Sequence, residues 1–219
     1  MNWELIVRYL PYLLEGAVLT VQLTVMGVAF GSVLGVILGL ARVSPFRFLR
    51  WLAIGYIDFF RGTPLLVQIF LIHMGLPQLG IDLGSAINSA IIALTLNSGA
   101  YIGEIFRAGI QSIDRGQMEA ARSLGMSYLQ SMRHIILPQA FKRVIPPLGN
   151  EFITLLKDSS LVSVISAEEL MMKANVMQGT TYRPFEAYLT AAAIYLILTL
   201  TISQLVAYAE RRLKTGDSH

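Results

Sequence analysis

Two carboxylates stand inside a predominantly apolar stretch, where a charged group is costly. Glu151 and Asp158 are seven residues apart within residues 144–166, with Leu155 between them on the same helical face. Ionisable side chains in apolar segments are rare and usually functional, because burial disfavours their charged form. The two carboxylates could therefore bind a cationic group. A competing interpretation is that Asp158 pairs with Lys157 or Arg61 and only holds helices together.

A second polar group follows a break in the apolar stretch 51–75. Residues 62–64 (Gly-Thr-Pro) interrupt the helix there, because proline lacks a backbone donor and disfavours helix at the preceding residue. Such a break must line a cavity or be buried in protein. Gln68 is flanked by apolar residues and needs a polar partner. Asp58 and Arg61 stand three residues apart, a spacing that allows an ion pair.

The next apolar stretch, residues 85–106, also carries polar side chains on one face. Asn97, Tyr101 and Glu104 occupy positions i, i+4 and i+7 of the expected helix. Glu104 and Arg107 are three residues apart, so we expect an ion pair near the end of this helix.

The basic stretch of residues 114–143 lies between long apolar runs and predicts two short helices. Asp114 can accept hydrogen bonds from the first free N–H groups, and Gln117 follows three residues later, as in a capping box. Gly125 suits the left-handed position that ends the first helix. Ser127 can cap the second helix, which is expected to run toward residue 138.

Several kinds of catalytic and binding site are excluded by the residues themselves. There is no cysteine, which rules out disulfides, thiol catalysis and cysteine-ligated zinc. Neither a P-loop nor an HExxH motif occurs, and His73, His134 and His219 are too scattered to suggest a metal site. Ser159 and Ser160 have no nearby histidine for a triad. We therefore expect no catalytic residue and no metal or cofactor in this chain.

The composition indicates an integral membrane protein. The 219 residues are 54% hydrophobic and only 14% charged, with a mean hydropathy of +0.59, whereas soluble domains carry about 25% charged residues. The predicted fold class is all-α, with residues 1–219 forming one transmembrane domain and residues 114–143 a helix-turn-helix loop. Five membrane-spanning helices are expected, at residues 16–41, 51–75, 85–106, 144–166 and 187–209.

Glycine and proline refine these boundaries. Gly27, Gly31, Gly35 and Gly39 recur every four residues, which predicts close packing of the first span against another helix. Residues 1–15 resemble a short interfacial lead-in to that span. We also expect residues 146–147 (Pro-Pro) to open the fourth span, and a short interfacial helix around residues 168–177.

Most of the 17 lysines and arginines follow the first and third expected spans or lie near the C-terminus, at Arg211, Arg212 and Lys214. Because basic residues collect in cytoplasmic loops, this distribution predicts an external N-terminus and a cytoplasmic C-terminus. The basic stretch 114–143 would then also be cytoplasmic.

The basic stretch has a further pattern, made by Glu119, Ala120, Ala121, Gly125, Ile135, Leu137 and Pro138. This spacing resembles the coupling loop of permease subunits in bacterial ABC importers. Residues 60–68, 97–113 and 149–161 are similar to the polar-amino-acid branch of these permeases, of the histidine, glutamine and arginine type. The resemblance implies a type I importer permease in the bacterial plasma membrane.

The same resemblance implies partners and a division of labour. The first short helix of the loop docks into a cleft on a separate ATPase subunit, which carries the ATP and Mg²⁺. Two permease subunits, expected as a homodimer, would assemble with two ATPase subunits and an extracytoplasmic solute-binding protein. ATP binding would drive alternating access. No nucleic acid is implied.

The substrate follows from the polar residues of the spans. We expect contacts from Glu151, Asp158, Asn97, Gln68 and Leu155. The α-ammonium and cationic side chain of a basic amino acid both favour carboxylates, so arginine, lysine or histidine is predicted. One alternative is an ATP-independent secondary transporter or channel subunit, but the inverted repeat that it predicts is not found. A membrane-embedded enzyme is the other, and the lack of catalytic residues argues against it.

Overall fold

The computed structural model describes residues 2–214, with side chains through residue 211, and contains no strand in that part of the chain. Its α-helices are α1 Trp3–Val43, α2 Arg47–Gly62, α3 Leu65–Phe70, α4 Leu76–Gln78, α5 Ala86–Gln111, α6 Arg115–Ser123, α7 Tyr128–Ser131, α8 Leu137–Asp158, α9 Leu170–Thr181 and α10 Pro184–Lys214. Two π-helical turns, Leu71–Gly75 and Met132–Ile136, and a 3₁₀-helix, Ser159–Ile165, adjoin them. The all-α prediction is confirmed. The side chains of Arg212, Lys214 and His219 lie outside the described part.

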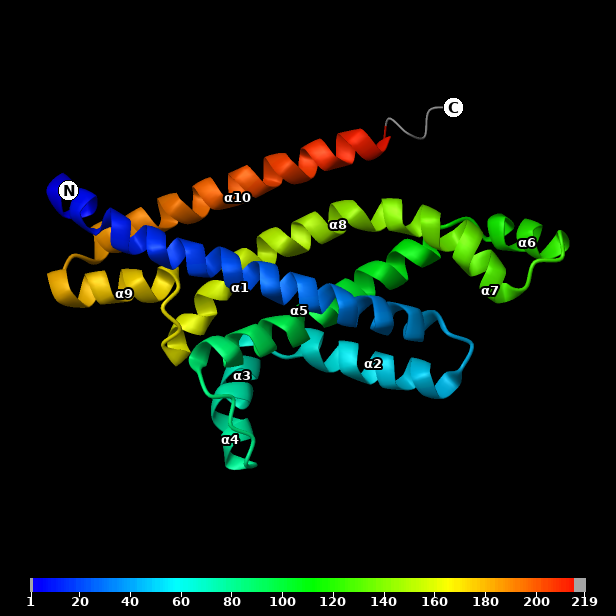
Figure 1. The fold of residues 1–219 in the computed structure, drawn as a ribbon, viewed down its shortest axis with the longest axis horizontal. Helices are drawn as coiled ribbons and strands as arrows, with labels where there is room; N and C mark the ends of the chain where they lie inside the picture. Colours follow the sequence, from blue (N-terminus) through cyan, green and yellow to red (C-terminus); the bar gives the residue numbers. More distant parts are fainter. Residues whose placement is uncertain (1, 215–219) are drawn as a thin grey trace.

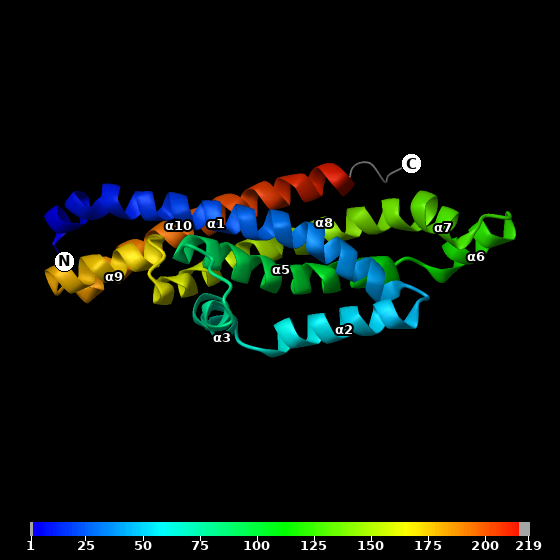
Figure 2. The same ribbon diagram turned by 60° about the horizontal axis from the view of Figure 1, so that its bottom comes forward.

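The long helices α1, α5, α8 and α10 run along the long axis of the molecule (Figure 1). The α6–α7 hairpin extends from one end, beside the turn between α1 and α2, whereas the N-terminus and α9 lie at the other end (Figures 1 and 2). α1 packs most extensively on α5. This arrangement places the loop of residues 114–143 at the same end as the loop that follows α1.

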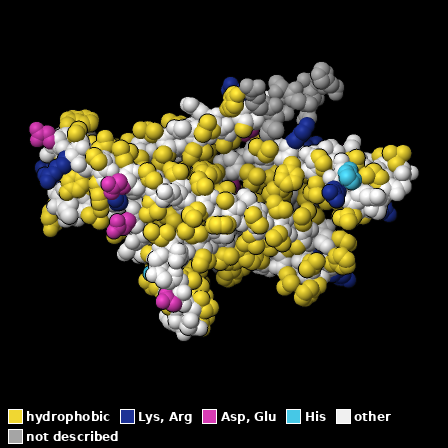
Figure 3. Space-filling model, in the orientation of Figure 1, with side chains coloured by type: hydrophobic (Ala, Val, Ile, Leu, Met, Phe, Trp, Pro, Cys, Tyr) yellow, Lys and Arg dark blue, Asp and Glu magenta, His cyan; other side chains and the backbone are white. Residues whose placement is uncertain are grey.

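Within residues 2–214, three helices are long and apolar enough to cross a membrane, namely α1, α5 and α10, or four if the bent segment of α2 through α4 counts as one span. α8 is not among them, because every stretch of it long enough to span contains Lys142, Arg143 and Glu151. Between the two ends the visible surface is mostly hydrophobic (Figure 3). The membrane character is therefore clear, and the count of five spans stays a prediction.

The predicted break in the second span is present. α2 ends at Gly62, Pro64 is extended with a ψ of 136°, and the chain turns by 105° before it continues through α3. The expected second span, residues 51–75, is thus not one continuous helix, in agreement with the predicted break. The reason is local, because Pro64 supplies no N–H for the helix and disfavours helical geometry at Thr63.

The first span is longer than expected. Residues 1–15 do not form a separate lead-in, because α1 continues without interruption from Trp3 to Val43 and includes Pro11. Tertiary contacts support its beginning, where Leu13 and Ala17 pack with α9 and α10 in one buried cluster. Packing of an apolar face thus stabilises the first turns of α1 in spite of the internal proline.

The glycine stripe of α1 packs closely against α5, in agreement with the predicted close approach of another helix. A Cβ atom on Gly35 would lie 2.5 Å from Cγ2 of Ile102 and 2.9 Å from the backbone nitrogen of Gly103, both in α5. In the reverse direction, a Cβ atom on Gly99 would lie 2.7 Å from Cδ2 of Leu34. The two backbones therefore approach so closely that only glycine fits at several crossing points.

The prolines near the fourth span do not mark its beginning. α8 starts at Leu137, has Pro138 in its first turn, and contains Pro146 and Pro147 in its interior, so the expectation that residues 146–147 open the helix was wrong. A π-helical turn, Met132–Ile136, leads directly into α8. Such a turn has looser hydrogen bonding, which lets the helix continue into Pro138. α9 covers residues 170–181, close to the interfacial helix expected around residues 168–177.

Candidate functional site

The helix α6 is built as its sequence predicts at both ends. Oδ1 of Asp114 accepts from the backbone N–H of Gly116 at 2.6 Å, although Gln117 does not complete a capping box. At the other end, Gly125 adopts a φ of +86°. The N–H groups of Gly125 and Met126 then donate to carbonyls of the last turn of α6, at 3.0 and 3.2 Å. These two bonds form a Schellman motif, which satisfies carbonyl groups that the helix end leaves free.

The second helix of the loop begins as predicted but does not stop where expected. Oγ of Ser127 accepts from the N–H of Gln130 at 3.3 Å, and Oε1 of Gln130 accepts from the N–H of Ser127 at 2.8 Å. This capping box fixes the start of α7. The helical path then runs through the π-turn into α8, so the loop ends in a rigid connection to the helix that carries Glu151.

The predicted docking residues divide between an outer and an inner face of the hairpin. Glu119 and Ala120 are exposed, whereas Ala121 is only 4% exposed. Leu124, at the tip, is 84% exposed. Of the other positions in the pattern, Ile135 and Leu137 are half-buried and Pro138 is exposed. Glu119 and Ala120 of α6, together with Leu124 directly after it, are therefore exposed on the outer face of the hairpin.

An apolar cluster fixes the base of the hairpin. Ile110 and Ile113, at the end of α5, pack with Met132 and Ile136 of the π-turn, and Met118 of α6 contacts the same cluster. A displacement of α6 would consequently be transmitted to α5 and α8 through packed side chains.

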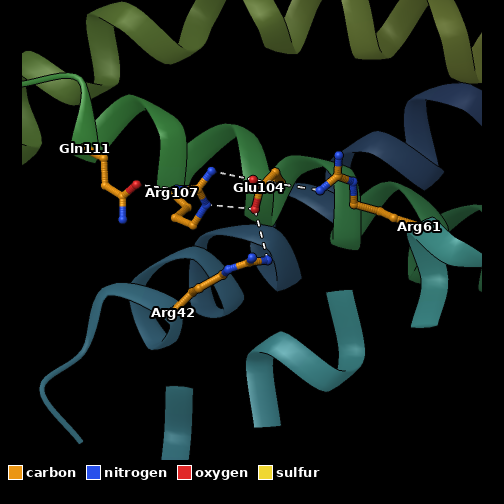
Figure 4. Close-up of polar contacts among 5 residues, drawn as sticks. All are labelled: Arg42, Arg61, Glu104, Arg107 and Gln111. Carbon is orange, nitrogen blue, oxygen red and sulfur yellow. Dashed lines mark hydrogen bonds and ion pairs between the residues drawn. The ribbon is translucent and has the colours of Figure 1, made fainter. Parts of the chain in front are cut away.

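Near this end, Glu104 is shared by arginines from three helices (Figure 4). Oε2 of Glu104 lies 2.9 Å from Nε of Arg107 and 3.0 Å from a guanidinium nitrogen of Arg42, and Oε1 lies 3.8 Å from one of Arg61. Arg107 also donates to Gln111. The cluster joins the end of α1, the end of α2 and the middle of α5. The sequence predicts the pair of Glu104 with Arg107, but not the contacts that come from distant parts of the chain.

Arg61 takes a different partner from the one expected. The carboxylate of Asp58 is exposed, and Arg61 is directed toward Glu104 and the ring of Tyr101, whose centroid lies 5.5 Å away. A helical spacing of three residues permits a pair but does not impose it. Here the partly buried carboxylate of Glu104 and the ring of Tyr101 interact with Arg61 more favourably than an exposed aspartate would.

Gln68 finds its polar partners at the helix break. Its Nε2 donates to the carbonyls of Phe60 at 2.8 Å and Thr63 at 3.0 Å, and contacts the Thr63 hydroxyl at 2.9 Å. Its Oε1 accepts from Nδ2 of Asn97 at 2.9 Å. The side chain thus satisfies carbonyl groups that the break leaves without helical donors. Gln68 and Asn97, both predicted substrate contacts, bind each other in this state.

The remaining predicted contacts lie along α8. Glu151 is 9% exposed, and among the described residues it makes no ion pair. Asp158, the last residue of α8, is half-buried, and it also makes no ion pair with a described residue, Lys157 and Arg61 included. Leu155 is 1% exposed and packs in the core toward Gly27 of α1.

At the opposite end, a buried carboxylate that sequence reasoning did not single out binds α9 to its neighbours. Glu169 caps α9 by accepting from the N–H groups of Met171 and Met172, both at 2.9 Å, and from the hydroxyls of Tyr195 at 2.8 Å and Thr20 at 3.4 Å. Burial raises the pKa of Glu169 above its usual range, whereas these four donors act in the opposite direction.

A buried lysine adds a second connection there. Nζ of Lys173 lies 2.8 Å from a carboxylate oxygen of Glu15 and 4.2 Å from the centroid of the Tyr12 ring. Together with Glu169 it attaches α9 to α1 and α10. The structural roles of Glu169 and Lys173 could not be predicted from the sequence, because their partners come from helices that are distant in the chain.

Comparisons with known proteins agree with this geometry. The model of the family described as binding-protein-dependent transport system inner membrane component matches residues 31–215. The arginine transport system permease protein ArtQ of Bacillus subtilis (strain 168) is 40% identical over 99% of this chain and 99% of its own length. The glutamine transport system permease protein GlnP of Escherichia coli (strain K12) is 38% identical over 97% of this chain and 98% of its own length.

A solved crystal structure, described as an amino acid ABC transporter with histidines, is 45% identical and superposes with a TM-score of 0.92 over 97% of this chain and 99% of its own. These relatives are permeases of ABC transporters, in which ATP is hydrolysed by a separate subunit. The chain belongs to the binding-protein-dependent transport system inner membrane components, as an amino acid permease subunit of an ABC transporter.

Proposed function

We propose that this chain is the permease subunit of an ATP-driven importer for a basic amino acid, acting as a homodimer in a bacterial plasma membrane. Its N-terminus would face the exterior, and the α6–α7 hairpin the cytoplasm. Two ATPase subunits would bind ATP and Mg²⁺ on the cytoplasmic side, and a solute-binding protein would deliver the amino acid from outside.

The coupling role is assigned to α6 because it combines an exposed face with a packed base. Glu119, Ala120 and Leu124 face outward, while Met118 and Ala121 face the rest of the hairpin. When ATP closes the ATPase pair, α6 would move with its docking cleft. The packed base would pass that movement to α5 and α8, and the helices would rock between inward-open and outward-open states.

The observation that carries the substrate assignment is the buried Glu151, which has no ion-pair partner among the described residues. An unpaired carboxylate is costly in an apolar helix, and a bound cation would offset that cost. Asp158 lies on the same helical face at the end of α8, so one carboxylate can receive the α-ammonium group and the other a cationic side chain. Arginine, named for the relative ArtQ, and the histidines named with the solved transporter fit this chemistry, whereas the glutamine named for GlnP is neutral, so the choice of a basic amino acid depends on the two carboxylates.

Three further residues complete the proposed site. Gln68 and Asn97 provide amide groups that can exchange their mutual hydrogen bond for the substrate. Leu155 lies between the two carboxylates and, because it packs toward α1, would fix the position of α8.

The experiment is uptake by proteoliposomes that contain the complete complex, with Glu151→Gln as the variant. Glutamine keeps the shape of the side chain and removes its charge. Loss of a hydrogen bond to a charged group costs about 1.5–3 kcal/mol, so arginine uptake is expected to fall roughly 10- to 100-fold. The exposed Asp58, changed to Asn, is the matched control and should transport normally. Unchanged uptake by the Glu151 variant, with an unchanged preference for basic over neutral amino acids, would refute the assignment.

A further inference from the structure

A polar cavity lies where the ends of α1 and α5 meet the α6–α7 hairpin. Its volume is about 480 Å³. Three arginines, one aspartate and one glutamine line it, which are Arg42, Arg50, Arg115, Asp114 and Gln111. Its remaining lining is mostly apolar and includes Met118 and Met132. The cavity is therefore amphipathic, with an excess of positive charge.

The positive charge is only partly compensated within the chain. Arg50 and Arg115 make no ion pair with any described residue. Arg42 contacts Glu104, but that carboxylate is shared with two other arginines. The lining aspartate, Asp114, already accepts from the backbone of Gly116. Two guanidinium groups from different helices thus remain available to an anion.

Neighbouring aromatic residues indicate the depth of this cavity in a membrane. Phe46, Phe48 and Trp51 surround the start of α2 and are 69%, 74% and 73% exposed. Exposed aromatic rings next to arginines are typical of the membrane–water interface, where lipid headgroups lie. Arg50 stands within the same turn and a half of helix, so its guanidinium can reach headgroup level.

We propose that this cavity binds the phosphate headgroup of an anionic phospholipid from the leaflet that faces the hairpin. Arg50 and Arg115 would hold the phosphate, since guanidinium groups match its oxygens in paired hydrogen bonds. Basic pockets between membrane helices on the cytoplasmic side bind such headgroups. The assignment of that leaflet as cytoplasmic rests on the proposed function.

The placement of the two arginines gives the lipid a mechanical role. Arg50 belongs to the first turn of α2, and Arg115 is the first residue of α6. A phosphate between them would connect the start of α2 to the coupling helix across the cavity. Anionic lipid would therefore hold α6 against the ends of the membrane helices and strengthen the coupling of ATP hydrolysis to transport.

The experiment measures lipid binding to the purified permease–ATPase complex by native mass spectrometry, with phosphatidylglycerol and phosphatidylcholine at equal concentrations. The complex is expected to prefer phosphatidylglycerol. Arg50→Gln and Arg115→Gln should each weaken its binding about fivefold, which corresponds to about 1 kcal/mol per basic residue. The control is Arg47→Gln, because Arg47 lies in the same turn of α2 but does not line the cavity. It should change binding less than twofold.

Three results would overturn the proposal. One is equal binding of both lipids, and another is the same loss in Arg47→Gln as in Arg50→Gln. The third concerns the source of the phosphate: if soluble glycerol phosphate displaces the lipid at equal concentration, the cavity is a site for free phosphate. These lipid-binding measurements do not depend on transport. A result that overturns the lipid site therefore leaves the proposed function intact. Failure of ATP-dependent uptake by the unaltered complex would instead overturn the proposed function.

Discussion

Gly125 allows a direct test of the proposed coupling role of α6. A side chain at this position would cause backbone strain but no steric clash, so the two effects are not confused. A Cβ atom at this position would meet no atom within 4 Å, yet φ is +86°. The cost of a side chain here is therefore conformational. An L-residue in the left-handed region costs about 1–2 kcal/mol, asparagine less and β-branched residues more. At 1.4 kcal/mol per tenfold, Gly125→Ala should reduce the population of the correctly ended α6 roughly 5- to 30-fold.

The assay compares ATP hydrolysis and uptake in the same proteoliposomes for Asn, Ala and Val at position 125. We expect the ratio of transported amino acid to hydrolysed ATP, or assembly of the complex itself, to fall in the order Asn, Ala, Val. Gly55→Ala is the matched control, because Gly55 also faces open space but lies within α2. Alanine should stabilise that helix by up to about 1 kcal/mol. Full coupling in Gly125→Val would refute the docking role of α6.

Three further substitutions test the packing around the proposed pathway. Gly35→Ala should lower the thermal midpoint of the purified complex by forcing Ile102 aside, at a cost of about 1–3 kcal/mol; an unchanged midpoint would contradict the close contact of α1 with α5. Gln68→Leu should cost about 2–4 kcal/mol, because the carbonyls at the helix break and the Asn97 amide lose their partner. A double-mutant cycle with Asn97→Leu should recover about 1 kcal/mol, and strict additivity would count against the hydrogen bond. Glu104→Gln should loosen α1 and α2 from α5, detected as faster hydrogen exchange in the helical turns around Arg42, Arg61 and Glu104; unaltered exchange would show that the arginine cluster is not a structural junction.

Features with a short-range cause could be predicted from the sequence. The N-caps at Asp114 and Ser127 and the left-handed Gly125 each depend on a few neighbouring residues, and the structure has all three. The predicted capping box of Asp114 with Gln117 is absent, and a capping box forms instead at Ser127 with Gln130. The break at Pro64 has the same kind of cause. The close packing of the glycine stripe was predicted for another reason. Glycines repeated every four residues on a helix allow any neighbouring helix to approach closely.

Other features depend on contacts that no local pattern reveals. Glu104 draws in Arg42 from α1 and Arg61 from α2, which are far apart in the chain. The prediction that residues 146–147 open the fourth helix was wrong because α8 already begins at Leu137, directly after a π-turn, so that Pro146 and Pro147 lie in its interior. The buried hydrogen bonds of Glu169 could not be predicted either, because its partners Tyr195 and Thr20 are distant in the sequence.

The central claim is that this chain has no energy source of its own and takes the work of transport from a separate ATPase through α6. The most direct measurement is arginine uptake by liposomes that contain the purified permease, before and after addition of the ATPase subunits, ATP and the solute-binding protein. The account predicts no accumulation by the permease alone and accumulation against a gradient once the partners and ATP are present. Concentrative uptake by the permease without the ATPase would contradict it.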